Sequence, residues 1–135
     1  MVSAELSRYL ELDASYTYTD STQPDEGGNQ IAEIRRPHHL GAFNLNYAAS
    51  DRVNINVNLA FNGSQFDTFF PPFPQSPEQR KLASYKLVTL AASYQLTPRL
   101  KLFGRIENLL DEDYEDVIGF NTPGIGAYVG VRTEL

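Results

Sequence analysis

Hydrophobic and polar residues alternate with a period of two along most of the chain. The clearest case is residues 53–62, in which Val53, Ile55, Val57, Leu59 and Phe61 alternate with Asn54, Asn56, Asn58, Ala60 and Asn62. Successive side chains of a strand point to opposite faces, so this spacing predicts a β-strand with one apolar and one amide-rich face. The alternation recurs in residues 9–20, 40–50, 85–96, 99–109 and 126–135.

These stretches predict about six strands, each longer than the usual 5 or 6 residues of a globular strand. The connections alternate between long (residues 20–36, 66–84 and 109–123) and tight (residues 49–52 and 96–99). Tight turns make neighbouring strands antiparallel. The pattern therefore predicts an all-β, antiparallel up-and-down segment of a transmembrane β-barrel. Natural single-chain membrane barrels begin at about eight strands, so the barrel would be incomplete as a single chain.

Aromatic residues decide which face we expect to meet lipid. Tyr16, Tyr18 and Phe61 lie at the long-loop ends of their strands, and Tyr47 and Tyr94 lie at the tight-turn ends. Rings at both rims are typical of the aromatic girdles of a membrane barrel. The apolar face would then contact acyl chains and the amide face a wet lumen. A soluble barrel with the apolar face inside remains the alternative.

Composition narrows the function classes. The chain has 135 residues, a net charge of −6, a pI of about 4.8 and no cysteine. An acidic chain offers no electrostatic footprint for nucleic acid, and the lack of cysteine excludes disulfides and thiolate metal sites. No apolar run approaches the roughly 18 residues of a membrane helix. The first residues, MVSAELSRYLELD, lack the features of a signal peptide.

Residues 100–132, LKLFGRIENLLDEDYEDVIGFNTPGIGAYVGVR, resemble the C-terminal end of a TonB-dependent outer-membrane receptor. The family pattern has a strand that runs into Asn-Leu-(Phe/Leu)-Asp, then Tyr, then Pro-Gly and a last strand. Its positions here are Asn108, Leu109, Leu110, Asp111, Tyr114, Pro123 and Gly124. The stretch NLLDEDYEDVIGFNTPG is most similar to the vitamin B12 receptor branch. The chain departs from the pattern at Ile125, often Arg in the family, and at Leu135, usually aromatic.

The resemblance implies a receptor of the Gram-negative outer membrane that takes up a scarce nutrient of the siderophore-iron, cobalamin or haem type. Its implied partners are outer-membrane lipid, the remaining barrel strands, a plug, TonB and a metal-chelate ligand. Residues 1–135 would form the C-terminal part of the barrel, with no plug domain, and would not transport alone. Two alternatives stay open: a small self-standing or oligomer-completed outer-membrane barrel of structural role, and a soluble β-barrel that binds a lipophilic ligand.

Two groups of residues are candidate sites. The first is an aromatic group on a predicted outer loop, Phe66, Phe69, Phe70 and Phe73, which could gather a ligand or pack together. The second is a polar group predicted to face the lumen: Asn54, Asn56, Asn58, Lys101, Arg105, Glu107 and Arg132. Its charged members could line a solute path, or pair with one another or with the plug.

No catalytic, metal or cofactor constellation is found. His38 and His39 are adjacent, and adjacent strand residues point to opposite faces, so the two rings would not share an ion. The acidic residues 111–116 lack the spacing of a calcium loop, and no Gly-x-Ser-x-Gly motif offers a nucleophile. We therefore expect neither an enzyme nor a bound metal or cofactor.

Overall fold

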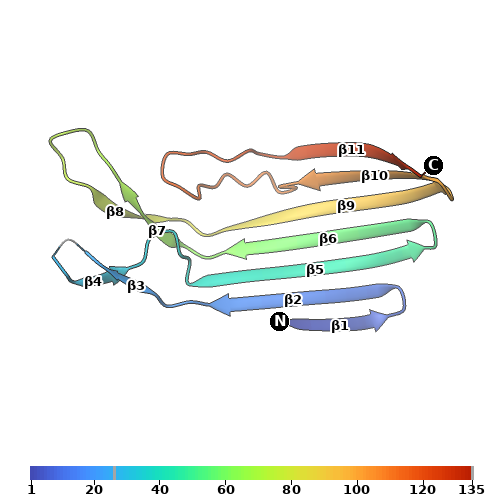
Figure 1. Cartoon of the computed structure of the whole chain (residues 1–135), viewed down its shortest axis with the longest axis horizontal. Coiled ribbons are helices and arrows are strands. Elements are labelled where there is room, and N and C mark those ends of the chain that lie inside the picture. The colour runs from blue at the N-terminus through green and yellow to red at the C-terminus, as the bar shows by residue number, and fades with distance from the viewer. Residues whose placement is uncertain (26, 135) are drawn as a thin grey trace.

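The structure is a computed structural model that describes residues 1–25 and 27–134, and it consists of one open β-sheet with two small hairpins at one end (Figure 1). The strands of the main sheet, in spatial order, are β1 (Val2–Ser7), β2 (Leu10–Tyr18), β5 (His39–Ser50), β6 (Val53–Asn62), β9 (Tyr85–Thr97), β10 (Leu100–Glu107) and β11 (Gly126–Thr133). Every neighbouring pair is antiparallel. The all-β, up-and-down prediction is confirmed.

The main sheet has seven strands, one more than the predicted number of about six. The missed strand is β1, whose alternation is short and is interrupted by a register shift between Glu5 and Ser7. Two of the predicted long loops also contain hairpins of their own. They are formed by β3 (Thr22–Pro24) with β4 (Gln30–Ala32), and by β7 (Gln65–Phe69) with β8 (Glu78–Leu82).

The register gives the sheet one apolar and one polar face. One cross-strand row reads Ala4, Leu12, Leu45, Val57, Leu90, Ile106 and Ala127. The adjacent row reads Glu5, Glu11, Asn46, Asn56, Ala91, Arg105 and Tyr128. Because side chains alternate along each strand, the first row lies on the apolar face and the second on the polar face.

The two ends of the sheet differ. Tight turns join β1 to β2, β5 to β6 and β9 to β10 at the turn end, whereas the long connections and both hairpins gather at the loop end (Figure 1). The predicted tight turns at residues 49–52 and 96–99 are confirmed. Both edge strands, β1 and β11, run toward the turn end, since Ser7 precedes one turn and Thr133 pairs with Leu100.

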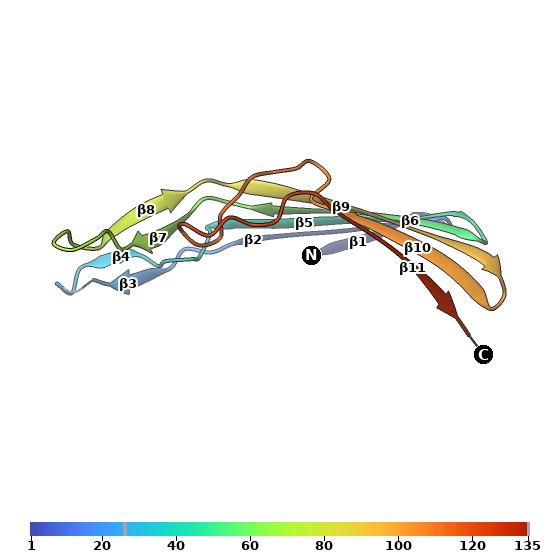
Figure 2. The same ribbon diagram turned by 90° about the horizontal axis from the view of Figure 1, so that it is seen from above.

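A second layer that could cover the sheet is lacking in the described part of the chain, and Figure 2 shows the ribbon edge-on as a thin, curved layer. Leu82 and Tyr85 are the only buried hydrophobic residues among those described. Large apolar side chains such as Tyr47, Phe61 and Val131 are exposed. No helix in the described residues is long and apolar enough to cross a membrane.

Candidate functional site

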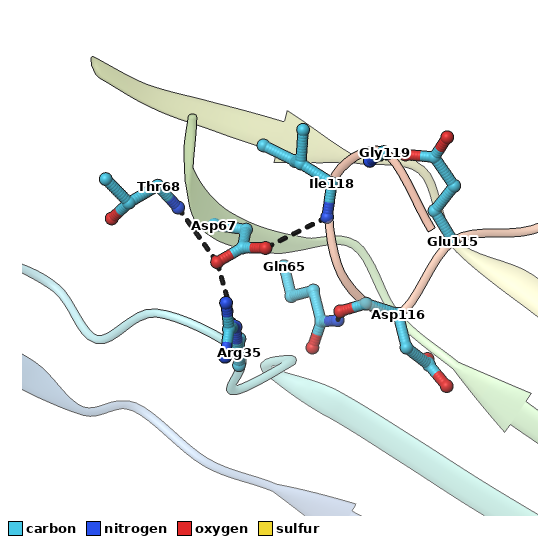
Figure 3. A network of polar contacts seen from close by, with 8 residues as sticks. All are labelled: Arg35, Gln65, Asp67, Thr68, Glu115, Asp116, Ile118 and Gly119. Atoms are coloured by element: carbon cyan, nitrogen blue, oxygen red, sulfur yellow. Dashed lines mark hydrogen bonds and ion pairs between the residues drawn. The ribbon is translucent and has the colours of Figure 1, made fainter. Parts of the chain in front are cut away.

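The loop end is organised around Asp67, a carboxylate with no solvent exposure. Its Oδ1 atom accepts hydrogen bonds from Arg35 Nε and from the Thr68 backbone N–H, both at 2.9 Å. Its Oδ2 atom accepts one from the Ile118 backbone N–H at 3.0 Å. Figure 3 shows these bonds converging from three segments, and we call Asp67 with these three partners the loop hub.

The loop hub fits the requirement that a buried charge be paired and hydrogen-bonded. Burial by itself raises the pKa of Asp67. The Ile118 and Thr68 N–H groups and the Arg35 guanidinium more than offset burial, so the pKa lies below its ordinary value. Asp67 is therefore an anion at neutral pH that ties together segments 32 and 51 residues away along the chain.

Further backbone and amide contacts join the same three segments. The Arg35 N–H donates a hydrogen bond to the Phe66 carbonyl at 2.7 Å, and Ile34 forms an isolated parallel β-bridge with Phe66. The side-chain amide of Gln65 donates to the Asp116 carbonyl at 3.0 Å. Residues that are far apart in sequence thus form one assembly at the loop end, rather than three independent loops.

The motif residues that carried the family resemblance close the loop between β10 and β11. Asn108 is 6% exposed and has a φ of 48°, a left-handed conformation that Asn tolerates. Its side chain accepts from the Glu112 N–H and donates to the carbonyls of Glu112 and Pro123. The Leu109 backbone N–H donates a hydrogen bond to the Val88 carbonyl. Asn108 therefore joins the start of the loop to its end.

Asp111 and Tyr114 add two more attachments. Asp111 Oδ1 accepts from the Ile125 N–H at 3.0 Å, and a Cβ on Gly124 would lie 2.7 Å from this oxygen, so any larger residue there would displace the Asp111 carboxylate. The Tyr114 ring stacks on Tyr85 with centroids 4.2 Å apart. Motif residues 108–124 thus have structural contacts that explain the pattern.

A pocket of about 480 Å³ lies between this loop and the junction of β8 with β9. Its lining includes Lys81, Ser84, Asp113, Glu115 and Asn121. The volume is in the range of small-molecule sites. The pocket offers charged groups of both signs and several hydrogen-bonding groups.

The four predicted aromatic residues divide into two pairs. Phe66 and Phe69 lie in β7 rather than in a loop, and the Arg80 guanidinium lies 3.9 Å from the Phe69 ring centroid. Phe70 and Phe73 lie at the tip of the hairpin and are 71% and 98% exposed. The expectation of one aromatic loop is therefore wrong for the first pair, because β7 and β8 pair with each other.

The predicted polar group shares one face of the sheet. Asn56 pairs with Ala91, which pairs with Arg105, and Asn56 Nδ2 donates to Asn44 Oδ1 at 3.0 Å. Arg105 forms an ion pair of 3.1 Å with Glu107 and lies 5.0 Å from the Tyr128 ring centroid. The structure therefore brings the predicted residues together and leaves their role in a lumen as a prediction.

Like charges face each other near both edges of the polar face. Glu5 pairs with Glu11 on β1 and β2, and Lys101 pairs with Arg132 on β10 and β11. The ion pairs found among the described residues include none of these four side chains. Like charges directly opposite each other destabilise a sheet, so both edges favour a neighbour of opposite charge.

His38 and His39 share a ring neighbour. The Tyr18 ring centroid lies 6.2 Å from that of His38 and 5.3 Å from that of His39. His39 Nδ1 is hydrogen-bonded to the Tyr16 hydroxyl at 2.7 Å. No group of three or more metal-ligating side chains occurs in the part of the chain that the structure describes.

The loop hub is the feature that sequence reasoning missed. Arg35, Asp67 and Ile118 belong to no motif, and their spacing of tens of residues gives no local signal. A weak signal does exist in residues 65–69, where Asp67 lies between Phe66 and Phe69 in a polar, proline-rich connection.

Comparisons with known proteins agree on a family. The family model described as TonB dependent receptor-like, beta-barrel, matches residues 2–109. A vitamin B12 transporter of Photobacterium profundum is 34% identical over 102 residues, covering 76% of this chain and 15% of that protein. An iron-regulated outer membrane virulence protein of Vibrio cholerae is 29% identical over 114 residues, covering 83% of this chain and 17% of that protein.

Solved structures agree on the fold. The ferripyoverdine receptor of the outer membrane of Pseudomonas aeruginosa superposes with a TM-score of 0.79 at 22% identity, covering 97% of this chain and 18% of the receptor. The ferric-catecholate import receptor Fiu of Escherichia coli K12 superposes with a TM-score of 0.78 at 15% identity, covering 97% of this chain and 19% of the receptor. The chain thus spans under a fifth of the length of each of these relatives. It matches part of a barrel, and it belongs to the TonB-dependent receptor-like β-barrel family.

Proposed function

We propose that this chain supplies seven consecutive strands of an outer-membrane receptor barrel that takes up a scarce metal chelate or cobalamin. The observation that carries the proposal is the sheet itself: a single layer with an uninterrupted apolar row on one face and an amide-rich row on the other. An apolar face of this extent requires a cover, and acyl chains provide one without a second protein layer.

In this proposal the loop end faces the outside and makes first contact with the ligand. The loop hub holds the three long connections together, so that the pocket beside Lys81 and the exposed tip rings Phe70 and Phe73 keep a common orientation. The ligand class follows from relatives that include a vitamin B12 transporter and a ferripyoverdine receptor. A plug and TonB would act through the rest of the receptor, and we expect no enzymatic activity.

Closure of the barrel requires further strands, from the same polypeptide or another. Both edge strands run toward the turn end, so copies joined head to tail would pair β11 with β1 in parallel. Pairing β1 with the β1 of a second copy, or β11 with β11, would be antiparallel. It would also invert one copy, so that the long loops of the two copies would lie on opposite sides of the membrane. Both arrangements depart from the antiparallel up-and-down barrel, which argues against an oligomer-completed barrel.

Antiparallel closure instead requires an odd number of additional strands, beginning and ending with strands that run toward the loop end. Plugged outer-membrane transporters have about 22 strands. Removing the seven found here leaves about 15, an odd number.

The test uses single nitroxide labels in the chain reconstituted into lipid vesicles, which the absence of native cysteine makes straightforward. Labels at Ile55 and Val57 should be accessible to oxygen dissolved in the acyl region, and labels at Asn54 and Asn56 to a water-soluble nickel complex. The reverse pattern, or full folding in detergent-free buffer as a monomer, would support the soluble barrel and refute the proposal.

A further inference from the structure

The apolar face carries one charge. When the register is followed across the seven described strands, the face consists of aliphatic, aromatic and small residues, with Lys86 on β9 as its only Lys, Arg, Asp or Glu. Lys86 is exposed and is absent from the ion pairs found among the described residues. By contrast, Arg105 on the opposite face has the carboxylate of Glu107 at 3.1 Å.

Lys86 lies at the loop end of this face, in a row with aromatic residues. It pairs with Phe61, which pairs with Gly41, which pairs with Tyr16. The next pair outward is Tyr18 with His39. We call Tyr16, Tyr18, His39, Phe61 and Lys86 the rim patch.

The rim patch is held in place by its own contacts. Tyr16 is hydrogen-bonded to His39 at 2.7 Å, and the Tyr18 ring lies 5.3 Å from the His39 ring. All five members remain exposed on the apolar face.

An ammonium group among acyl chains is costly, so a lysine at this height extends its charge to the headgroup level. Rings that carry a hydroxyl or imidazole group are favourable at the same level. A compact, strongly hydrated ammonium is suited to binding phosphate as a point charge. The next row toward the middle of the sheet consists of Ala14, Phe43, Leu59 and Val88. None of these residues has a polar side chain that could compete with the rim patch for a phosphate group.

We propose that the rim patch binds the phosphate group of an anionic membrane lipid in the leaflet at the loop end. Lys86 supplies the charge, and the Tyr16–His39 pair contacts the polar part of the headgroup layer. Two strand spacings of about 4.8 Å and a two-residue step of about 6.6 Å along the strand separate His39 from Lys86, so their backbones lie roughly 12 Å apart, within the span of neighbouring headgroups. The inference rests on the proposed orientation of the apolar face toward lipid.

The test measures lipid contact at the patch in vesicles. A benzophenone amino acid replaces Phe61, and the chain is reconstituted into phosphatidylcholine that contains a minor fraction of labelled phosphatidic acid. Only chains that float with the vesicles are analysed, so misfolded material does not contribute. Crosslinked phosphatidic acid should exceed its share of the lipid, and Lys86→Gln should reduce this excess about fivefold.

Two matched variants serve as controls for Lys86→Gln. Lys86→Arg should keep the excess, and Lys101→Gln, which removes one positive charge from the opposite face, should leave it unchanged. Inorganic phosphate should not compete beyond the effect of chloride at the same ionic strength. An unchanged excess in Lys86→Gln, an equal loss in Lys101→Gln, or specific competition by free phosphate would overturn the inference.

The spin-label experiment separates the two proposals. If labels at Ile55 and Val57 report acyl chains while phosphatidic acid shows no excess, the lipid site is refuted and the barrel orientation stands. If these labels report water, both proposals fall together.

Discussion

The sheet and the loop end are stabilised in opposite ways. The described residues that are buried, namely Gly63, Asp67, Leu82, Tyr85 and Asn108, all lie at the loop end or where a strand enters it. The main sheet has a continuous hydrogen-bonded ladder, but nearly all of its side chains are exposed or only half-buried. The loop end is therefore held together by internal contacts, whereas in the proposed orientation the sheet would depend on lipid and on neighbouring strands.

The environment of a residue is therefore determined differently in the two regions. Along the sheet, each residue's environment follows from its parity, because in the proposed orientation lipid and water lie on opposite sides. At the loop end, each residue's environment follows from long-range partners such as Arg35 and Ile118 around Asp67. Substitutions in the sheet and at the loop end should therefore alter stability in different ways.

The largest expected effect is a charge placed in the middle of the apolar face. Val57→Arg should destabilise the membrane-inserted sheet by about 2–4 kcal/mol, the cost of Arg on a lipid face near the midplane. The measurement is the urea midpoint of folding in vesicles. Asn56→Arg, one position away on the polar face, is the matched control and should change the midpoint little. Equal losses in the two variants would contradict the assignment of faces.

Removal of the hub carboxylate should loosen the loop end and spare the sheet. Asp67→Ala leaves the buried N–H groups of Thr68 and Ile118 without a partner, at a cost of about 1–3 kcal/mol. Amide hydrogen exchange should accelerate at Thr68 and Ile118 and stay slow at Val57. Asp67→Asn, which keeps one acceptor oxygen, should show a smaller change. Equal acceleration throughout β6 would show that the two regions are not independent.

Acidification should weaken the hub in the same direction. The pKa of Asp67 lies below its ordinary value, so its stabilisation is fully present above the unfolded-state pKa of about 3.9. It is lost as the pH falls from there through the lower folded-state pKa. Exchange at Ile118, corrected for intrinsic rate, should accelerate across this range in the native chain and not in Asp67→Asn. Loss of protection at higher pH would contradict the hub's role.

The smallest expected effect concerns the like-charge pairs of the polar face. Glu11→Gln removes the repulsion with Glu5 and should stabilise the isolated chain by about 0.5 kcal/mol, less at high salt. Lys101→Gln should act likewise through Arg132. Urea midpoints at low and high salt test both variants. Destabilisation by either substitution would indicate that the pair already has a partner of opposite charge.

The sequence alone determined the repeating part of this protein. Period-two alternation predicted the six strands β2, β5, β6, β9, β10 and β11, tight turns predicted their antiparallel order, and the rings at strand ends predicted the two rims. These properties are local, because a strand's two faces and a tight turn are each specified by a few consecutive residues. The motif after β10 was also visible, since Asn108, Asp111 and Gly124 make contacts within one loop.

Only the tertiary structure decided the rest. Strand β1 was missed because its alternation is short and bulged, and the hairpins were missed because their strands are short and lie among prolines and polar residues. The loop hub, the shared row of Phe61 and Lys86, and the like-charge pairs all depend on which segments lie side by side. Alternation assigns a residue to a face, but strand pairing chooses its neighbours, and those neighbours determine whether a charge is paired, buried or left to bind something else.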